Sequence, residues 1–95
     1  MSDRDLFRID GEEFETREGT WVAKLLGGPR RKADSDEVRF EIEFLLKVSD
    51  VRRRLDLVVL QAPLEVETAM YVPRLFLCVD GWLNRNDPPR ELRCF

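Results

Sequence analysis

The chain has 95 residues, of which 43% are hydrophobic and 37% are charged, and its formal net charge is −3. This length suits one domain, residues 1–95, and enough apolar residues are present to build a single modest core. The acidic balance argues against a general nucleic-acid-binding protein, which usually carries a basic excess. Because the chain contains no histidine, histidine-based acid/base and nucleophilic catalysis are excluded.

The first part of the chain has the pattern of a β-meander. Turn signals at Asp10-Gly11 and Glu18-Gly19 separate three segments in which apolar and polar residues alternate. These turns place Phe14 opposite Ala23 and gather most apolar side chains on one face. The predicted strands cover residues 6–9, 12–17 and 20–26.

The last of these segments has an alternative assignment. A short helix from Trp21 to Leu26 would have Thr20 as its N-cap and Gly27 as its C-cap. Gly27-Gly28-Pro29 is expected to end the strand and to open a long polar loop.

The strongest pattern in the chain lies at Val38–Val48. All of its even-numbered positions are apolar, and four of its five odd-numbered positions are charged. Because side chains alternate between the two faces of a strand, this pattern predicts a long strand with one buried face. Leu45 is the exception, since it is an apolar residue on the charged face.

Two more strands are predicted after the central one. Leu55–Leu60 is apolar on nearly both faces, which is typical of a strand that is covered on both sides. Pro63 interrupts this pattern, and alternation resumes over Leu64–Met70 as a further strand.

A helix is predicted to begin at Pro73 and to end near residue 85, because apolar residues then recur at helical spacing. Gly81 costs such a helix up to ~1 kcal/mol relative to alanine, and a hairpin turn at Asp80-Gly81 is the alternative. Glu91–Phe95 is expected to be a short tail or edge strand. The predicted fold is therefore α+β: an antiparallel meander sheet of about five strands with one C-terminal helix on one face, open or curled into a partial barrel.

Cys78 and Cys94 are the only cysteines, and they form no C-x-x-C motif. Since a zinc site would need at least two carboxylate ligands here, we expect no metal and no cofactor. The charged N-terminus and the lack of a long apolar run predict a cytoplasmic protein without a membrane span. In that reducing compartment both thiols are expected to be free.

Carboxylates occur as two pairs, Glu41/Glu43 and Glu65/Glu67, each on the polar face of a predicted strand. Neighbouring strands could bring the four together to bind Mg²⁺ or Ca²⁺ for an enzymatic reaction. The favoured alternative is a solvated face on which these acids form cross-strand ion pairs. The expected partners are Arg39, Lys47 and Arg54.

Two basic runs, residues 30–32 and 52–54, suggest a phosphate site. The central strand between them spans about 35 Å, so the two runs should lie at opposite ends of the sheet and form no common site. Each run is expected to be a solvated loop, or else a contact for nucleic acid or an acidic partner.

Function is predicted from the second face of the sheet, because one helix covers only one face. An apolar patch on the other face would be covered by curling of the sheet or by another chain. We therefore expect a non-enzymatic protein-interaction module, namely an adaptor, an accessory subunit or an immunity-type inhibitor, that binds a dedicated protein or a second copy of itself. A nucleic-acid-binding accessory protein is the alternative. The predicted partner-binding residues are Leu45, Val58, Leu60, Arg52, Arg53 and Arg54.

Overall fold

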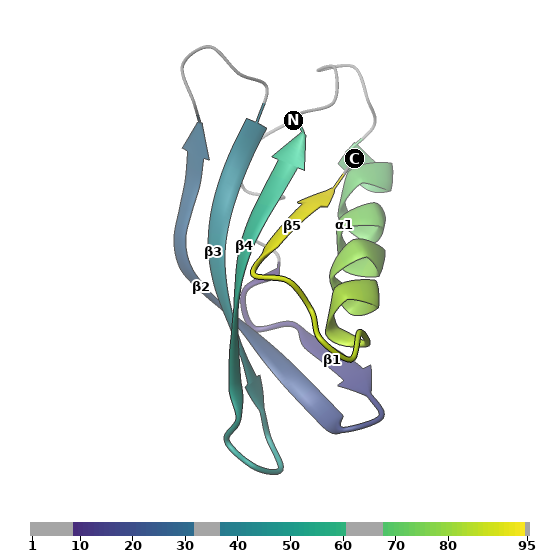
Figure 1. Cartoon of the computed structure of the whole chain (residues 1–95). Coiled ribbons are helices and arrows are strands. Elements are labelled where there is room, and N and C mark those ends of the chain that lie inside the picture. Colours follow the sequence, from purple (N-terminus) through teal and green to yellow (C-terminus); the bar gives the residue numbers. More distant parts are fainter. Residues whose placement is uncertain (1–8, 32–36, 61–67, 95) are drawn as a thin grey trace.

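The computed structural model describes residues 9–31, 37–60 and 68–94, which form one five-stranded sheet and one helix (Figure 1). The sheet order follows the chain, β1-β2-β3-β4-β5. The first three pairings are antiparallel, and β5 is parallel to β4. The elements are β1 (Glu13–Thr16), β2 (Gly19–Arg31), β3 (Glu37–Leu46), β4 (Arg52–Leu60), α1 (Thr68–Leu83) and β5 (Glu91–Cys94).

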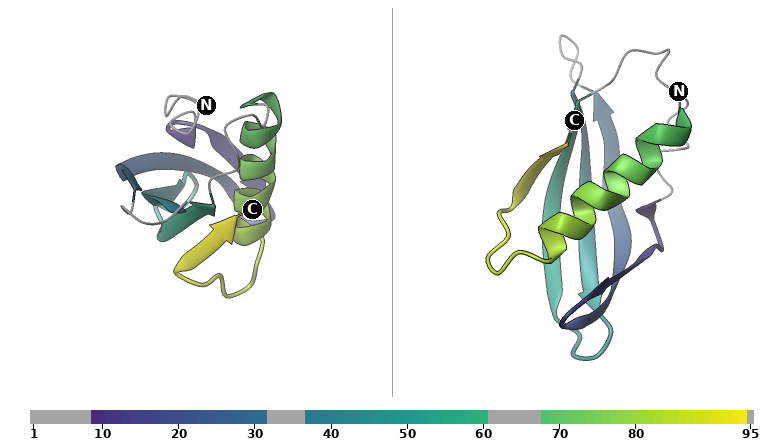
Figure 2. Two further views of the ribbon diagram at one scale, coloured as in Figure 1. Left: turned by 90° about the horizontal axis from the view of Figure 1, so that it is seen from above. Right: turned by 90° about the vertical axis from the view of Figure 1, so that its right-hand side faces the viewer.

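The sheet is curled into a half-barrel, and α1 fills its open side. Seen from above, the strands form a C-shaped wall around the helix (Figure 2). Inward side chains of the strands and one face of α1 make a single apolar core. Its centre is Phe44, whose ring lies 5.9 Å from that of Phe14 and 5.6 Å from that of Trp82, measured between centroids. The predicted α+β fold with a partial barrel and one helix is confirmed.

The central strand was predicted nearly to its ends. The inward positions of β3 are all buried, in agreement with the alternating pattern. Val48 is the exception, because the chain turns after Leu46 and the Val48 side chain is left 74% exposed. Residue 50 completes this turn with a left-handed backbone, which Asp tolerates better than most residues (φ 59°).

The β1–β2 hairpin has the predicted faces but a different register. Phe14 pairs with Trp21 instead of Ala23, which is a shift of two residues. The Thr16 hydroxyl stabilises the observed turn, because it accepts hydrogen bonds from the Glu18 amide (3.2 Å) and the Trp21 indole (3.0 Å). A shift of two keeps each side chain on its original face, so the buried residues were still predicted correctly.

Strand β2 continues through Gly27-Gly28-Pro29, where the sequence predicted its end. The ladder with β3 is interrupted by irregularities around Gly27 and then resumes at Arg30. Gly28 has φ +106°, and a Cβ there would lie 2.6 Å from the Arg39 carbonyl oxygen. The glycines therefore form a bulge that lets the strand bend without ending. The alternative helix at Trp21–Leu26 is wrong.

The C-terminal third differs most from the prediction. Thr68–Met70, expected at the end of a strand, is the first turn of α1, so Pro73 lies within the helix and not at its start. The rest of that predicted strand, like the one at residues 6–9 except Ile9, lies outside the described residues. The hairpin at Asp80-Gly81 is wrong, because both residues belong to α1.

The strand that completes the sheet is instead β5. It runs parallel to β4, because α1 brings the chain back to the end of the sheet at which β4 begins. The sheet is therefore mixed and not a pure antiparallel meander. Within the parts of the chain that the structure describes, no helix is both long enough and apolar enough to cross a membrane.

Cys78 of α1 and Cys94 of β5 form a disulfide, which corrects the prediction of two free thiols. Their Cα atoms are 6.4 Å apart, which is within the range that a disulfide can bridge. The two cysteines meet because β5 pairs with β4 and so lies beside α1. Their separation of 16 residues in the sequence does not indicate this contact.

We expect that the disulfide adds about 3 kcal/mol to the free energy of unfolding, because it closes a loop of 16 residues. Urea denaturation of the wild type with and without a thiol reductant measures this contribution. The double variant Cys78→Ser/Cys94→Ser is the control, because reductant should not change its midpoint. Equal midpoints for oxidised and reduced wild type would contradict the prediction.

Candidate functional site

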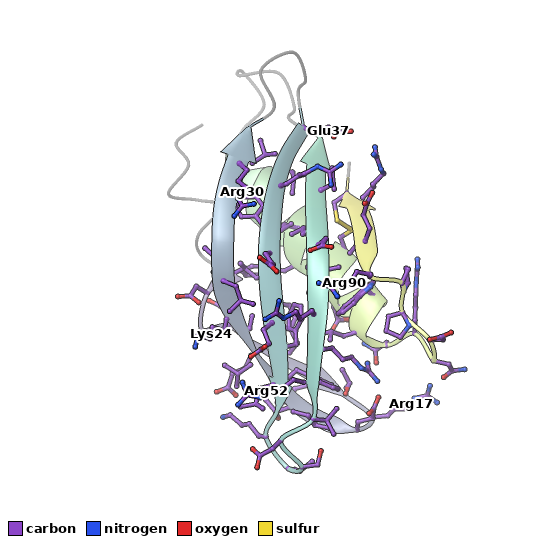
Figure 3. The ribbon with its side chains drawn as sticks, turned by 60° about the vertical axis from the view of Figure 1, so that its left-hand side comes forward. Arg17, Lys24, Arg30, Glu37, Arg52 and Arg90 are labelled. Carbon is purple, nitrogen blue, oxygen red and sulfur yellow. A yellow bond between two sulfur atoms is a disulfide. The ribbon has the colours of Figure 1, made fainter. Side chains whose placement is uncertain are left out.

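The candidate site is the outer face of the sheet, meaning the face opposite α1 (Figure 3). Side chains alternate along each strand, so the outer face carries the residues between the core positions. None of the described helices or strands covers it. Its members are Val22, Lys24 and Arg30 of β2, Glu37, Arg39, Glu41, Glu43 and Leu45 of β3, Arg52, Arg54, Asp56 and Val58 of β4, Arg90 directly before β5, and Glu91 and Arg93 of β5.

Charges on the outer face are arranged in rows across the strands. The carboxylates of Glu41, Asp56 and Glu91 occupy directly paired positions on β3, β4 and β5. Each is neutralised by an arginine from elsewhere on the face: Arg54 lies 3.1 Å from Glu41, and Arg90 lies 3.4 Å from Asp56. Of the three predicted partners of the paired carboxylates, Arg54 is confirmed, whereas Lys47 pairs with Glu13 and Arg39 pairs with acids at other positions.

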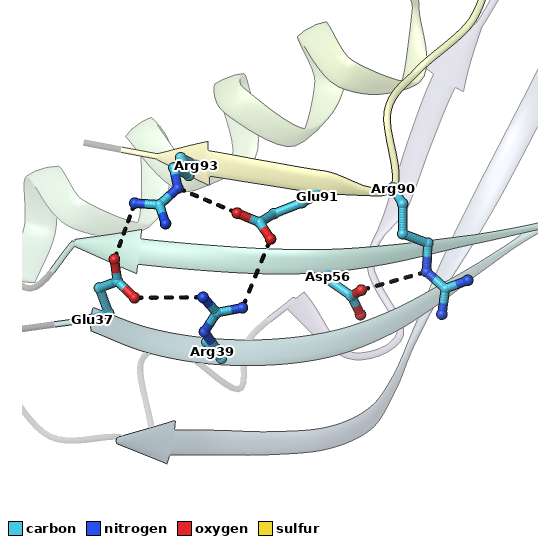
Figure 4. Close-up of polar contacts among 6 residues, drawn as sticks. All are labelled: Glu37, Arg39, Asp56, Arg90, Glu91 and Arg93. Carbon is cyan, nitrogen blue, oxygen red and sulfur yellow. Dashed lines mark hydrogen bonds and ion pairs between the residues drawn. The ribbon is translucent and has the colours of Figure 1, made fainter. Parts of the chain in front are cut away.

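A second group of ion pairs joins β3 to β5 although β4 lies between them (Figure 4). Arg93 approaches Glu37 at 3.0 Å and Glu91 at 3.2 Å, while Arg39 lies 3.6 Å from Glu37 and 3.8 Å from Glu91. The negative charge of Glu37, and a hydrogen bond to it, raise the pKa of Arg93 above its usual value.

The predicted apolar partner-binding residues have different environments. Val58 is fully buried although it points to the outer face, because its paired neighbours Arg39 and Arg93 have long side chains that shield it. Leu45 is half-buried and pairs with Val22, forming a small apolar area near the end of the sheet. Leu60 ends β4 opposite Glu37, and its side chain lies outside the described part of the structure.

The predicted basic residues 52–54 already have partners. Arg52 binds Glu43 at 2.8 Å, and Arg54 binds Glu41 and Glu43. Arg53 points to the other face, where it lies over the Trp21 ring, donates to the Leu83 carbonyl and pairs with Glu18. Each of the three arginines is therefore already paired with a carboxylate of this chain.

The two basic runs lie apart, as predicted, but the prediction that they are loops is wrong, because Arg30 and Arg31 belong to β2 and residues 52–54 are the first residues of β4. Arg30 pairs in register with Arg39, whereas Arg52 pairs with Leu45, six residues further along β3. The side chain of Arg31, and all of Lys32, lie outside the described residues.

Sequence reasoning missed a hollow of about 350 Å³ in the outer face. Its rim includes the charged side chains of Arg30, Arg39, Arg90, Glu41 and Asp56, and Val58 contributes apolar lining. Arg90 reaches the hollow because β5 docks beside β4, with the Arg90 carbonyl accepting a hydrogen bond from the Asp56 amide at 2.8 Å. A parallel pairing across a helix leaves no local signal, so the sequence could not have indicated Arg90.

The metal-dependent arrangement of carboxylates is not assembled in the described residues. No cluster of three or more Asp, Glu or Cys side chains there is suited to hold a metal ion. Glu41 and Glu43 pair with arginines, and Glu65 and Glu67 lie outside the described residues.

Comparison with known proteins gives no match: no family model, curated protein or solved structure is significantly similar to this chain. Any function must therefore be inferred from the geometry of the outer face.

Proposed function

We propose that this protein is a non-enzymatic protein-interaction module that binds its partner through the outer face of the sheet. The observation that supports the proposal is the outer face itself, a broad surface that no described element covers. Its arginine side chains are about half exposed, from 47% for Arg39 to 61% for Arg52. Arginine is enriched in protein interfaces and among the residues that dominate binding energy.

The partner is a dedicated protein or a second copy of this chain, in the manner of an adaptor, an accessory subunit or an immunity-type inhibitor. Val22 and Leu45 supply a small apolar area, and the surrounding charges would fix the orientation of the partner. Rows of opposite charge make the face able to meet either a complementary surface or itself.

A cytoplasmic location belongs to the same proposal. The Cys78–Cys94 disulfide argues against it, since such bonds persist mainly in oxidising compartments. Rapid acid quenching of cells followed by alkylation of free thiols measures the state of both cysteines. Alkylation of both cysteines supports the cytoplasmic location, and protection of both contradicts it.

Site-specific photocrosslinking in cells of the source organism tests the interaction. A photoreactive amino acid in place of Leu45 or Arg52 is expected to yield one discrete adduct, identified by mass spectrometry as one protein or as a second copy of this chain. The matched control is the same amino acid in place of Leu77, which is 73% exposed on α1 and lies away from the outer face. Light scattering on the purified chain then separates a homodimer from a monomer.

Adducts that form equally well from position 77, or no adducts from positions 45 and 52, would contradict the proposal. Replacement of Val58 is unsuitable for this test, because its full burial means that a charged residue there would unfold the domain.

A further inference from the structure

The arginines around the hollow differ from the other arginines of the outer face in how they use their donors. Arg52, Arg54 and Arg93 each donate a side-chain hydrogen bond, at 2.8, 3.1 and 3.0 Å. The guanidinium groups of Arg30, Arg39 and Arg90 donate none to any other residue in the described ranges. Arg39 and Arg90 have only ion pairs of 3.4 Å or more, and Arg30 has no ion pair within those ranges.

Unused guanidinium donors in one place indicate an anionic ligand. Each guanidinium carries five N–H donors in a planar fork that matches the two oxygens of a carboxylate or phosphate. Such charge-assisted hydrogen bonds are about twice as strong as neutral ones. Three of these forks line one hollow, and the bulge at Gly27 and Gly28 brings Arg30 back into register beside Arg39.

The rim also contains Glu41 and Asp56, which restricts the kind of anion. A nucleic-acid backbone presents phosphate acceptors repeatedly, but it has no N–H donors to satisfy the two carboxylates in the rim. A polypeptide presents both kinds of group, because its acidic side chains accept hydrogen bonds and its backbone amides donate them. The mixed rim therefore favours an acidic peptide segment.

We infer that the hollow binds an acidic segment of the partner protein, with its carboxylates on Arg30, Arg39 and Arg90 and its backbone amides facing Glu41 and Asp56. This inference rests on the proposed function, since it names the part of the partner that the outer face recognises.

Nuclear magnetic resonance of the ¹⁵N-labelled protein tests the inference through the arginine Nε–H signals. The probe is a capped hexapeptide of alternating glutamate and glycine, added to millimolar concentration. The signals of Arg30, Arg39 and Arg90 are expected to shift in a saturable way, while those of Arg52, Arg54 and Arg93 change little. The same peptide with glutamine in place of glutamate should produce no shifts.

Variants give the matched comparison. Arg30→Gln and Arg39→Gln are each expected to weaken peptide binding at least tenfold, because each removes a charge-assisted contact. Arg17→Gln, at an exposed position in the turn between β1 and β2 and away from the hollow, should change it less than twofold (Figure 3). A ¹⁵N spectrum of each variant verifies that the fold is intact.

Three outcomes would overturn the inference: no saturable shifts, equal shifts at all six arginines, or shifts caused by inorganic phosphate or a short oligothymidine but not by the acidic peptide. Crosslinks from positions 45 and 52 together with any of these would retain the proposed function and remove only the acidic segment. If the crosslinks from positions 45 and 52 and the shifts caused by the acidic peptide are both absent, the proposed function is contradicted as well.

Discussion

Replacing Gly28 by alanine is expected to lower the free energy of unfolding by about 4 kcal/mol, one of the two largest effects that we predict. A left-handed backbone at a non-glycine residue costs roughly 2 kcal/mol, and overlap with packed atoms costs a similar amount. Both apply at Gly28, where φ is +106° and an added Cβ meets the Arg39 carbonyl oxygen at 2.6 Å. Urea denaturation followed by tryptophan fluorescence measures the change.

Two other glycines provide controls that separate these causes. Gly11 also has positive φ (+83°) but no atom within 4 Å of an added Cβ, so Gly11→Ala should cost only about 1 to 2 kcal/mol. Gly81 lies within α1 with no nearby atom, so Gly81→Ala should stabilise the domain by up to ~1 kcal/mol. Equal costs at positions 28 and 11 would mean that the close approach to β3 is wrong.

Replacing Phe44 by alanine is expected to lower the free energy of unfolding by about 4 kcal/mol, since Phe-to-Ala changes in cores cost 3 to 5 kcal/mol. The Phe44 side chain is fully buried, and its ring lies between those of Phe14 and Trp82. The substitution would remove the ring contacts that Phe14 of β1 and Trp82 of α1 make with Phe44. Urea denaturation, followed by tryptophan fluorescence at several wavelengths, measures the loss in free energy of unfolding.

Leu77→Ala is the control for the core prediction, because this leucine is 73% exposed and should change stability by less than about 0.5 kcal/mol. Phe44→Leu keeps most of the volume and should cost about half as much as Phe44→Ala. A loss below 1 kcal/mol for Phe44→Ala would contradict the position of this ring at the centre of the core.

The sequence predicted those parts of the fold in which a local pattern and the burial of a face agree. Alternation over β3 identified its inward residues from Val38 to Leu46, because one-sided burial acts on each residue separately. The shift in the β1–β2 register arose from the Thr16 hydroxyl, whose hydrogen bonds outweighed the turn signal at Glu18-Gly19. Gly27-Gly28 was misread because a bulge and a strand end have the same composition.

The candidate site was less predictable than the fold. The outer face and its ion pairs followed from alternation, as did the separation of the two basic runs. The hollow did not follow, because it depends on Arg90, which reaches β3 and β4 only through the parallel docking of β5. The burial of Val58 could not be predicted for the same reason, since it comes from arginine side chains of two other strands.

The position of β5 has a consequence for biosynthesis. Strands β1 to β4 each pair with the strand next to them in the sequence, so they can form in order on the ribosome. The other edge of β4 stays unpaired until β5 is synthesised, because the partner of Asp56 is Glu91, 35 positions later. Until then, a nascent chain displays the backbone edge of β4 with Leu57, Val58 and Val59, which is a template for pairing with other chains. Docking of β5 closes this edge, and the Cys78–Cys94 disulfide links β5 covalently to α1.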